Sequence, residues 1–211
     1  MFEFQIYEFI LCIPPEFLYF GINLKIKTKM TLIIVLAVAA ALIFWFIRVQ
    51  NNLVSKDELC KNALSQIGVQ QSSRWDALTA LAELVKSYNE HEYKTLRDVI
   101  AMRKGISGTS NVDDANTQEE LMAQATKIIN VVAEQYPDLK SNENYGKAMD
   151  AVNTYENQVR MSRMVFNDTV TKYNKLIRQI PDSFVASLLG FQSREYLKEV
   201  ASKADMPSMN I

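Results

Sequence analysis

The one histidine of the chain is the first side chain to test for metal or acid–base chemistry. His91 lies within residues 90–95 (EHEYKT), with a glutamate on each side. A zinc-protease helix requires a second histidine four positions later on the same face, and that position holds Thr95. We therefore interpret His91 as a solvated residue at a helix junction. The alternative is a metal-dependent enzyme that uses His91 and nearby carboxylates.

The cysteines and glycines do not form a recognisable site either. Cys60 falls in an apolar helical stripe with no histidine near it in sequence, so we expect a packed, protonated thiol. Cys12 is distant from it, and the pair gives no disulfide framework. The glycines of residues 105–108 (GISG) follow a predicted helix, so they indicate a loop and not a phosphate cradle. The sequence predicts no catalytic residue, no cofactor or metal, and no small-molecule substrate.

Polar side chains interrupt the apolar stripes of two long predicted helices, and these are more informative. Gln70 and Arg74 lie on the first helix, and Glu156 and Arg163 lie on the second. If the two helices are antiparallel neighbours, these four can meet as a hydrogen-bonded layer, with Glu156 facing Arg74 or Arg163. Such layers fix helix register more than they add stability. The alternative is a polar groove that binds a partner.

Helical periodicity defines the elements that position these residues. Apolar residues recur three, four or seven apart and predict one long first helix, at Leu53, Cys60, Ala63, Ile67, Leu78, Leu81, Val85 and Tyr88. Asn89 is expected to cap a second, shorter helix, although unbroken continuation also fits the pattern. Cations followed by Gly105 end it, and residues 105–116 form the only long loop.

Two further helices follow the loop. Thr117 and Glu120 form a capping box for the third helix, which Pro137 ends. Ser141 or Asn142 caps the fourth, which Pro181 closes. Its stripe repeats at sevens, as in a coiled coil, at Tyr145, Val152, Val159, Phe166, Tyr173 and Ile180. We therefore predict an all-α fold, with an antiparallel four-helix bundle over residues 48–200 and a C-terminal tail at 201–211.

Residues 30–47 (MTLIIVLAVAAALIFWFI) contain no charge, proline or glycine. As a helix this run rises about 27 Å, close to the roughly 30 Å of a bilayer core. Polar residues follow from Arg48 onward, and no small-x-small signal-peptide cleavage site is present. We predict a single transmembrane helix, whose anchor residues are Leu32, Ile33, Ile34, Val35, Leu36, Leu42, Ile43, Phe44, Trp45 and Phe46.

Residues 1–29 fit this organisation poorly, and we interpret them as a mis-called N-terminal extension before a natural start at Met30. If they are translated, Lys25, Lys27 and Lys29 favour a cytoplasmic N-terminus. The formal net charge of -1 argues against nucleic acid as a partner. Near the other end, an apolar segment too short to span a bilayer either lies in the membrane interface or packs at the bundle end. Its residues are Phe184, Val185, Leu188, Leu189 and Phe191.

Three ordered motifs resemble the LemA family of bacterial membrane proteins. The first begins with residues 63–70 (ALSQIGVQ) and 74–76 (RWD), the second is 136–145 (YPDLKSNENY), and the third ends with 188–191 (LLGF). The resemblance covers essentially everything from Met30 onward. It implies an N-terminal anchor followed by a helical bundle, with no established enzymatic activity.

We therefore expect a non-catalytic interaction or scaffold module at the bacterial cell envelope. Its partners would be the lipid bilayer and another membrane or envelope protein. A lipid-interacting bundle and the metal-dependent enzyme described above are the alternatives.

Overall fold

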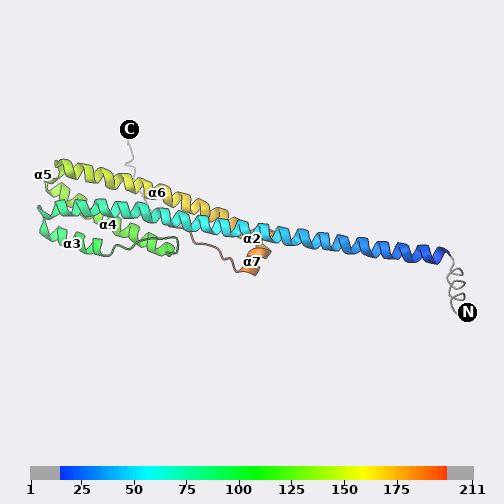
Figure 1. Cartoon of the computed structure of the whole chain (residues 1–211). Coiled ribbons are helices and arrows are strands. Elements are labelled where there is room, and N and C mark those ends of the chain that lie inside the picture. Colours follow the sequence, from blue (N-terminus) through cyan, green and yellow to red (C-terminus); the bar gives the residue numbers. More distant parts are fainter. Residues whose placement is uncertain (1–14, 199–211) are drawn as a thin grey trace, which may run out of the picture. The chain divides into compact units, whose positions relative to one another are not determined.

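The computed structural model describes the backbone of residues 15–198 and the side chains of residues 26–198. Its helices are α2 (Pro15–Lys86), α3 (Glu90–Ala101), α4 (Val112–Gln135), α5 (Pro137–Lys140), α6 (Glu143–Arg178) and α7 (Asp182–Leu189) (Figure 1). No strand occurs in this part of the chain, so the predicted all-α class is confirmed. The chain divides into two compact units, Met1–Asn51 and Asn52–Ile211.

The N-terminal unit contains the apolar run. Its described backbone is helical from Pro15 onward, and residues 26–44 expose their side chains to the surroundings. Trp45 and Phe46 are half-buried. Within the described residues, α2 is the one helix that is long and apolar enough to cross a membrane. Residues 1–14 of the predicted extension lie outside the described residues.

In the C-terminal unit, α2 and α6 are antiparallel neighbours. Residues 75–85 of α2 share a buried cluster with Tyr145 and Val152, near the start of α6. Residues 60–67 share a second cluster with residues 166–173, near the end of α6. The apolar residues that recur every seven positions along α6 therefore pack this helix against α2.

Helices α3 and α4 run in opposite directions to each other, as their contacts with α2 show. The Tyr93 hydroxyl of α3 donates to Glu83 of α2 at 2.9 Å, and Arg103, just after α3, reaches back to Asp76 at 2.7 Å. Helix α3 therefore runs antiparallel to α2. Helix α4 runs parallel to α2, because its early residue Ala115 accepts a hydrogen bond from Gln71 and its later residues pack with the end of α2. The order is that of an up-and-down bundle.

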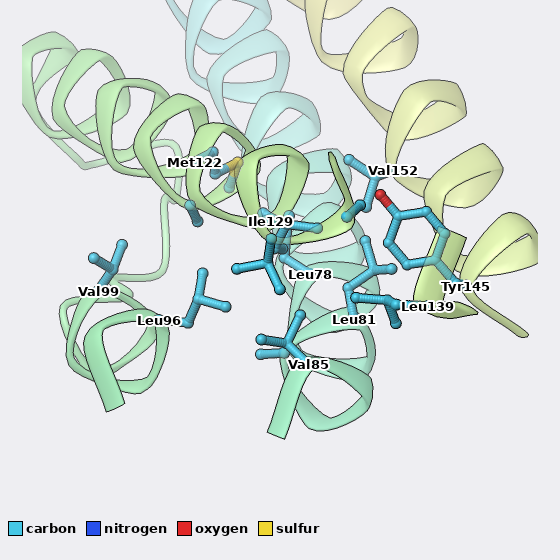
Figure 2. Close-up of a cluster of buried hydrophobic side chains, with 14 of the residues drawn as sticks. Leu78, Leu81, Val85, Leu96, Val99, Met122, Ile129, Leu139, Tyr145 and Val152 are labelled. Carbon is cyan, nitrogen blue, oxygen red and sulfur yellow. The ribbon is translucent and has the colours of Figure 1, made fainter. Parts of the chain in front are cut away.

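The larger cluster shows how the helices meet (Figure 2). All helices of the C-terminal unit except α7 contribute apolar side chains to it, including Leu81 from α2, Leu96 from α3, Ile129 from α4, Leu139 from α5 and Val152 from α6. Each of these five is fully buried. Burial of such side chains is worth roughly 1.5–3 kcal/mol each, so this end holds much of the unit's hydrophobic stabilisation.

The other end of the unit has no α3, and a loop packs there instead. A Cβ atom added to Gly68 of α2 would lie 2.0 Å from the carbonyl oxygen of Ile106, so only glycine admits the loop at this point. Ile106 is buried in the second cluster with Cys60 and Phe166. The glycine therefore allows a connecting loop to complete a core that lacks one helix.

The predicted start of the third helix, and with it the predicted end of the loop at residue 116, was wrong. Helix α4 begins at Val112, and its cap is Asn111, whose side chain accepts from the Asp113 amide at 3.3 Å. Asp113 and Asp114 then occupy the first turn, where carboxylates favour the helix dipole. This signal precedes the expected cap, Thr117, which lies inside the helix.

The ends of the other helices also refine the prediction. Pro137 does not simply end a helix, because it also occupies the first turn of the short helix α5. Asn89 caps α3 and Asn142 caps α6, each through its side chain. Ile180 lies beyond the end of α6 and is 80% exposed, so it is not part of the buried stripe. The predicted tail at 201–211 lies outside the described residues.

Candidate functional site

A buried guanidinium joins three helices of the C-terminal unit. Arg74 on α2 donates to Glu119 on α4 at 2.7 Å and to Glu156 on α6 at 3.0 Å. The Arg74 side chain is only 3% exposed and that of Glu119 10%, whereas Glu156 is 33% exposed. Glu156 also accepts from Arg160 at 3.2 Å. The Arg74 charge at the centre thus has two carboxylate partners, of which Glu119 is the more deeply buried.

Arg163 forms a second connection in the same region. Its guanidinium donates to Asn116 on α4 at 2.9 Å and to the carbonyl oxygen of Lys198 at 2.7 Å. Burial lowers the pKa of Arg163, and the negative charge of Glu119 acts in the opposite direction. The layer therefore ties α6 both to α4 and to the segment that follows α7.

Gln118 extends the layer toward the loop. Its side-chain oxygen accepts from the Trp75 indole at 3.1 Å and from the Lys104 amide at 3.0 Å. Its side-chain nitrogen donates to the Met102 carbonyl oxygen at 3.2 Å. One amide thus satisfies polar groups of α2 and of the chain that leaves α3.

Several buried atoms of this layer have no hydrogen-bond partner among the described residues. They are Gln71 Oε1, Arg74 Nε, Asn116 Nδ2, Glu119 Oε2 and Arg163 Nη1. An unpaired buried polar group costs about 1–3 kcal/mol. The layer is therefore better suited to specifying which helix faces meet than to maximising stability.

The structure brings Arg74 and Glu156 together, and it places Arg163 beside Asn116. Gln70 does not join them, because it is half-buried and lines a surface groove. Sequence reasoning missed Asn116 because it began the third helix at Thr117. It missed Gln118 and Glu119 because no local pattern shows which face of this helix meets the other helices. A start at Asn111 would have placed Asn116 and Glu119 one turn apart on one face.

The groove lined by Gln70 lies between α2 and α6. Its volume is about 460 Å³, and it is lined by Gln70, Thr154, Asn157, Gln158, Met161 and Ser162. Apolar side chains are exposed on the same two helices. Val69 on α2 is 57% exposed, and Met161, Met164 and Val165 on α6 are 58%, 59% and 53% exposed. The groove lining therefore combines uncharged polar groups with the flexible side chain of Met161, and further apolar side chains are exposed on the same two helices.

The apolar segment near the C-terminus has some buried and some exposed side chains. Val185 is buried and Phe191 is half-buried against the second cluster. Phe184, Leu188 and Leu189 are exposed. The segment thus packs at the bundle end with one side and leaves the other side uncovered.

The candidate chemical residues are placed as follows. His91 is exposed on the first turn of α3. Within the described residues, no three His, Cys, Asp or Glu side chains form a group that could hold a metal ion. Cys60 is fully buried in the second cluster, and desolvation raises the pKa of its thiol. These positions support neither the hypothesis of a metal-dependent enzyme nor that of a reactive thiol.

Comparison with known proteins gives two matches. The model of the LemA family matches residues 63–210 of the chain. Protein LemA of Metamycoplasma hominis is 28% identical over 153 residues, which cover 70% of this chain and 68% of that relative. The matched region contains α3 to α7 and the Arg74 layer.

Proposed function

The chain belongs to the LemA family, and from this premise we propose that it is a single-pass membrane protein of the cell envelope. Its bundle binds another protein through the groove between α2 and α6, and it does not catalyse a reaction. The observation that carries the proposal is the uncharged run at residues 30–47, whose large apolar side chains are exposed along nearly its whole length.

The membrane part of the proposal follows from solvation. Ile33, Val35 and Phe44 are each more than 60% exposed, and such a surface is strongly unfavourable in water. In hydrocarbon the same surface is favourable, because the helix satisfies its own backbone hydrogen bonds. Arg48 marks the point at which charge returns, as expected at a bilayer boundary.

The protein-binding part follows from how the bundle uses its polar groups. The buried charges of Arg74 and Glu119 are paired with each other, which suits a structural role. The groove beside Met161 instead leaves polar and apolar groups open to a partner. Methionine side chains adapt to irregular partner surfaces, which supports binding over chemistry at this place.

Fractionation of the full chain tests the anchor. We expect the protein to sediment with membranes through high-salt and alkaline washes and to be released by detergent. Substitution of Val38 by Arg costs about 3 kcal/mol of insertion free energy at the helix centre and should lower the membrane fraction, whereas Val38→Ala should not. A full-length chain that stays in the supernatant without detergent refutes the proposal.

Photo-crosslinking in intact cells tests the groove. A photoreactive residue at Met161 should capture a discrete protein, and one at the exposed residue Asn130 of α4 serves as the matched control. Val69→Glu, at the exposed residue that precedes the groove residue Gln70 on α2, should reduce the capture. Equal capture from both positions, or no effect of Val69→Glu, contradicts a specific groove.

A further inference from the structure

Helix α7 lies at the end of the C-terminal unit at which α2 enters it. After α7 the chain returns along α6: the Tyr173 hydroxyl donates to the Gln192 carbonyl oxygen at 2.9 Å, and Asn167 pairs with Leu197 further back. Arg194 in this segment binds Asp57 of α2 at 2.7 Å. Asp57 comes only five residues after Asn52, the first residue of the unit. These contacts fix α7 at the entry end.

The outward side of α7 and Ile180, two residues before the helix, form a row of large apolar side chains. Ile180, Phe184 and Leu188 are spaced by four and are 80%, 70% and 76% exposed. Val185 and Ala186, on the other side of the helix, are 3% and 1% exposed. The helix is thus anchored by its inner side, and its outer side is free for contact with another phase or molecule.

The short chain connection between the apolar run and this unit indicates that the phase is the membrane. The uncharged run ends at Ile47, and Asp57 follows about ten residues later, which rise about 15 Å as a helix and span at most about 36 Å if extended. If residues 30–47 cross a bilayer, the end of the unit that carries α7 is therefore held close to the membrane surface. Lys175 and Arg178, in the last turn of α6, add cations at this end, which suit anionic headgroups.

We propose that α7 is a second membrane contact, in which Ile180, Phe184 and Leu188 insert into the boundary between headgroups and acyl chains. An apolar helix face at such a boundary is buried by about 5–10 Å. This inference rests on the proposed membrane anchor and deepens it. A second attachment restricts the rotation of the bundle about its tether, so that a partner meets the groove in a defined orientation.

The test places a fluorescent reporter on the outer side of α7 in the full chain. Leu188→Cys is labelled with the environment-sensitive dye NBD, in a background that carries Cys12→Ser. Met161→Cys is the matched control, since it is comparably exposed but lies on the groove. The buried Cys60 stays in place, and its labelling is measured in the background without an added cysteine.

The labelled proteins are reconstituted into phosphatidylcholine–phosphatidylglycerol vesicles, some of which contain lipid with a nitroxide on the acyl chain. We expect NBD at position 188 to shift its emission to shorter wavelengths and to lose intensity with the nitroxide lipid. NBD at position 161 should show neither change. Phe184→Cys should behave like Leu188→Cys.

Each other outcome overturns the inference. Emission at position 188 that matches position 161 shows that α7 faces water. A shift without quenching, which grows with the protein-to-lipid ratio, shows that a second copy covers the face. Flotation of the vesicles separates these results from failure of the anchor itself, because a chain that does not float with lipid contradicts the proposed function first.

Discussion

Substitution of Arg74 gives the sharpest test of the buried layer. Among the described residues, Arg74 is the one hydrogen-bond partner of the Glu119 carboxylate, which is 10% exposed and has one unpaired oxygen, and Arg74→Met removes it. Breaking a buried pair by removing one member costs about 3–5 kcal/mol, because the remaining charge is uncompensated. Glu156 is less affected, since it is one-third exposed and retains Arg160.

The double variant distinguishes this explanation from a simple loss of contacts. Arg74→Met combined with Glu119→Met removes both charges and fills the space with apolar atoms. We expect the double variant to be more stable than Arg74→Met alone, because replacing a whole buried pair is often neutral or favourable. Glu156→Ala should cost only about 1 kcal/mol, because its pair is partly solvated and Arg74 keeps Glu119.

The measurement is urea and thermal unfolding of residues 52–211. In this fragment Trp75 is the only tryptophan, and its indole is 1% exposed and bonded to Gln118, so its fluorescence reports on the layer itself. For a unit of this size, 3–5 kcal/mol lowers the midpoint by roughly 6–20 °C. An Arg74→Met variant no weaker than Glu156→Ala, or a double variant weaker than Arg74→Met, would refute the reasoning.

Two further substitutions test the loop and the entry end by the same unfolding assay. Gly68→Ala forces a Cβ atom against the Ile106 carbonyl and should cost about 1–3 kcal/mol. The control Gly146→Ala, whose added Cβ meets nothing within 4 Å, should stabilise α6 by roughly 0.5–1 kcal/mol. Equal effects of the two substitutions would contradict the close approach of the Ile106 carbonyl to Gly68. For Asp57, burial alone raises the pKa, but hydrogen bonds from Arg194 and Lys61 outweigh it and leave the pKa below its usual value. Its contribution is therefore present above a pH of about 4 and is lost as the pH falls further, so Asp57→Asn should cost about 1 kcal/mol at neutral pH and progressively less in acid. Glu58→Gln, at an exposed pair, should change stability little at any pH, and a deficit of Asp57→Asn that persists in acid would rule out the ion pair as its cause.

The sequence predicted the elements well where local signals act alone. The stripe of α6 and the caps Asn89 and Asn142 depend on periodicity and short-range hydrogen bonds, which are visible in a single segment. The start of α4 was misplaced because two valid capping signals compete, at Asn111 and Thr117. Only burial of Ala115 and Asn116 against the rest of the unit decides between them.

The candidate site was predicted only in part for a related reason. Arg74 and Glu156 were identifiable because each interrupts an apolar stripe on its own helix. Glu119 was not, because its role depends on which face of α4 meets α2, and no local pattern states that. The packing of Ile106 on Gly68 was equally hidden, since it joins a loop to a helix far away in sequence.

The hydrogen bonds around the C-terminal segment bear on whether the exposed face of α7 is a stable feature. Asn174 donates to the Arg194 carbonyl oxygen and accepts from the Arg194 amide, and Asn167 does the same with Leu197. The backbone groups of an extended segment have no hydrogen-bond partners within the segment. The side-chain amides of Asn167 and Asn174, which lie seven residues apart on α6, therefore bind backbone groups that would otherwise lose hydrogen bonds on burial. Helix α7 is thus held by α6 on one side and by this pinned segment on the other. In a frayed chain end, exposed apolar residues would have no fixed direction. A helix that is fixed at both ends instead presents Phe184 and Leu188 in a defined direction. A membrane contact requires such a defined direction.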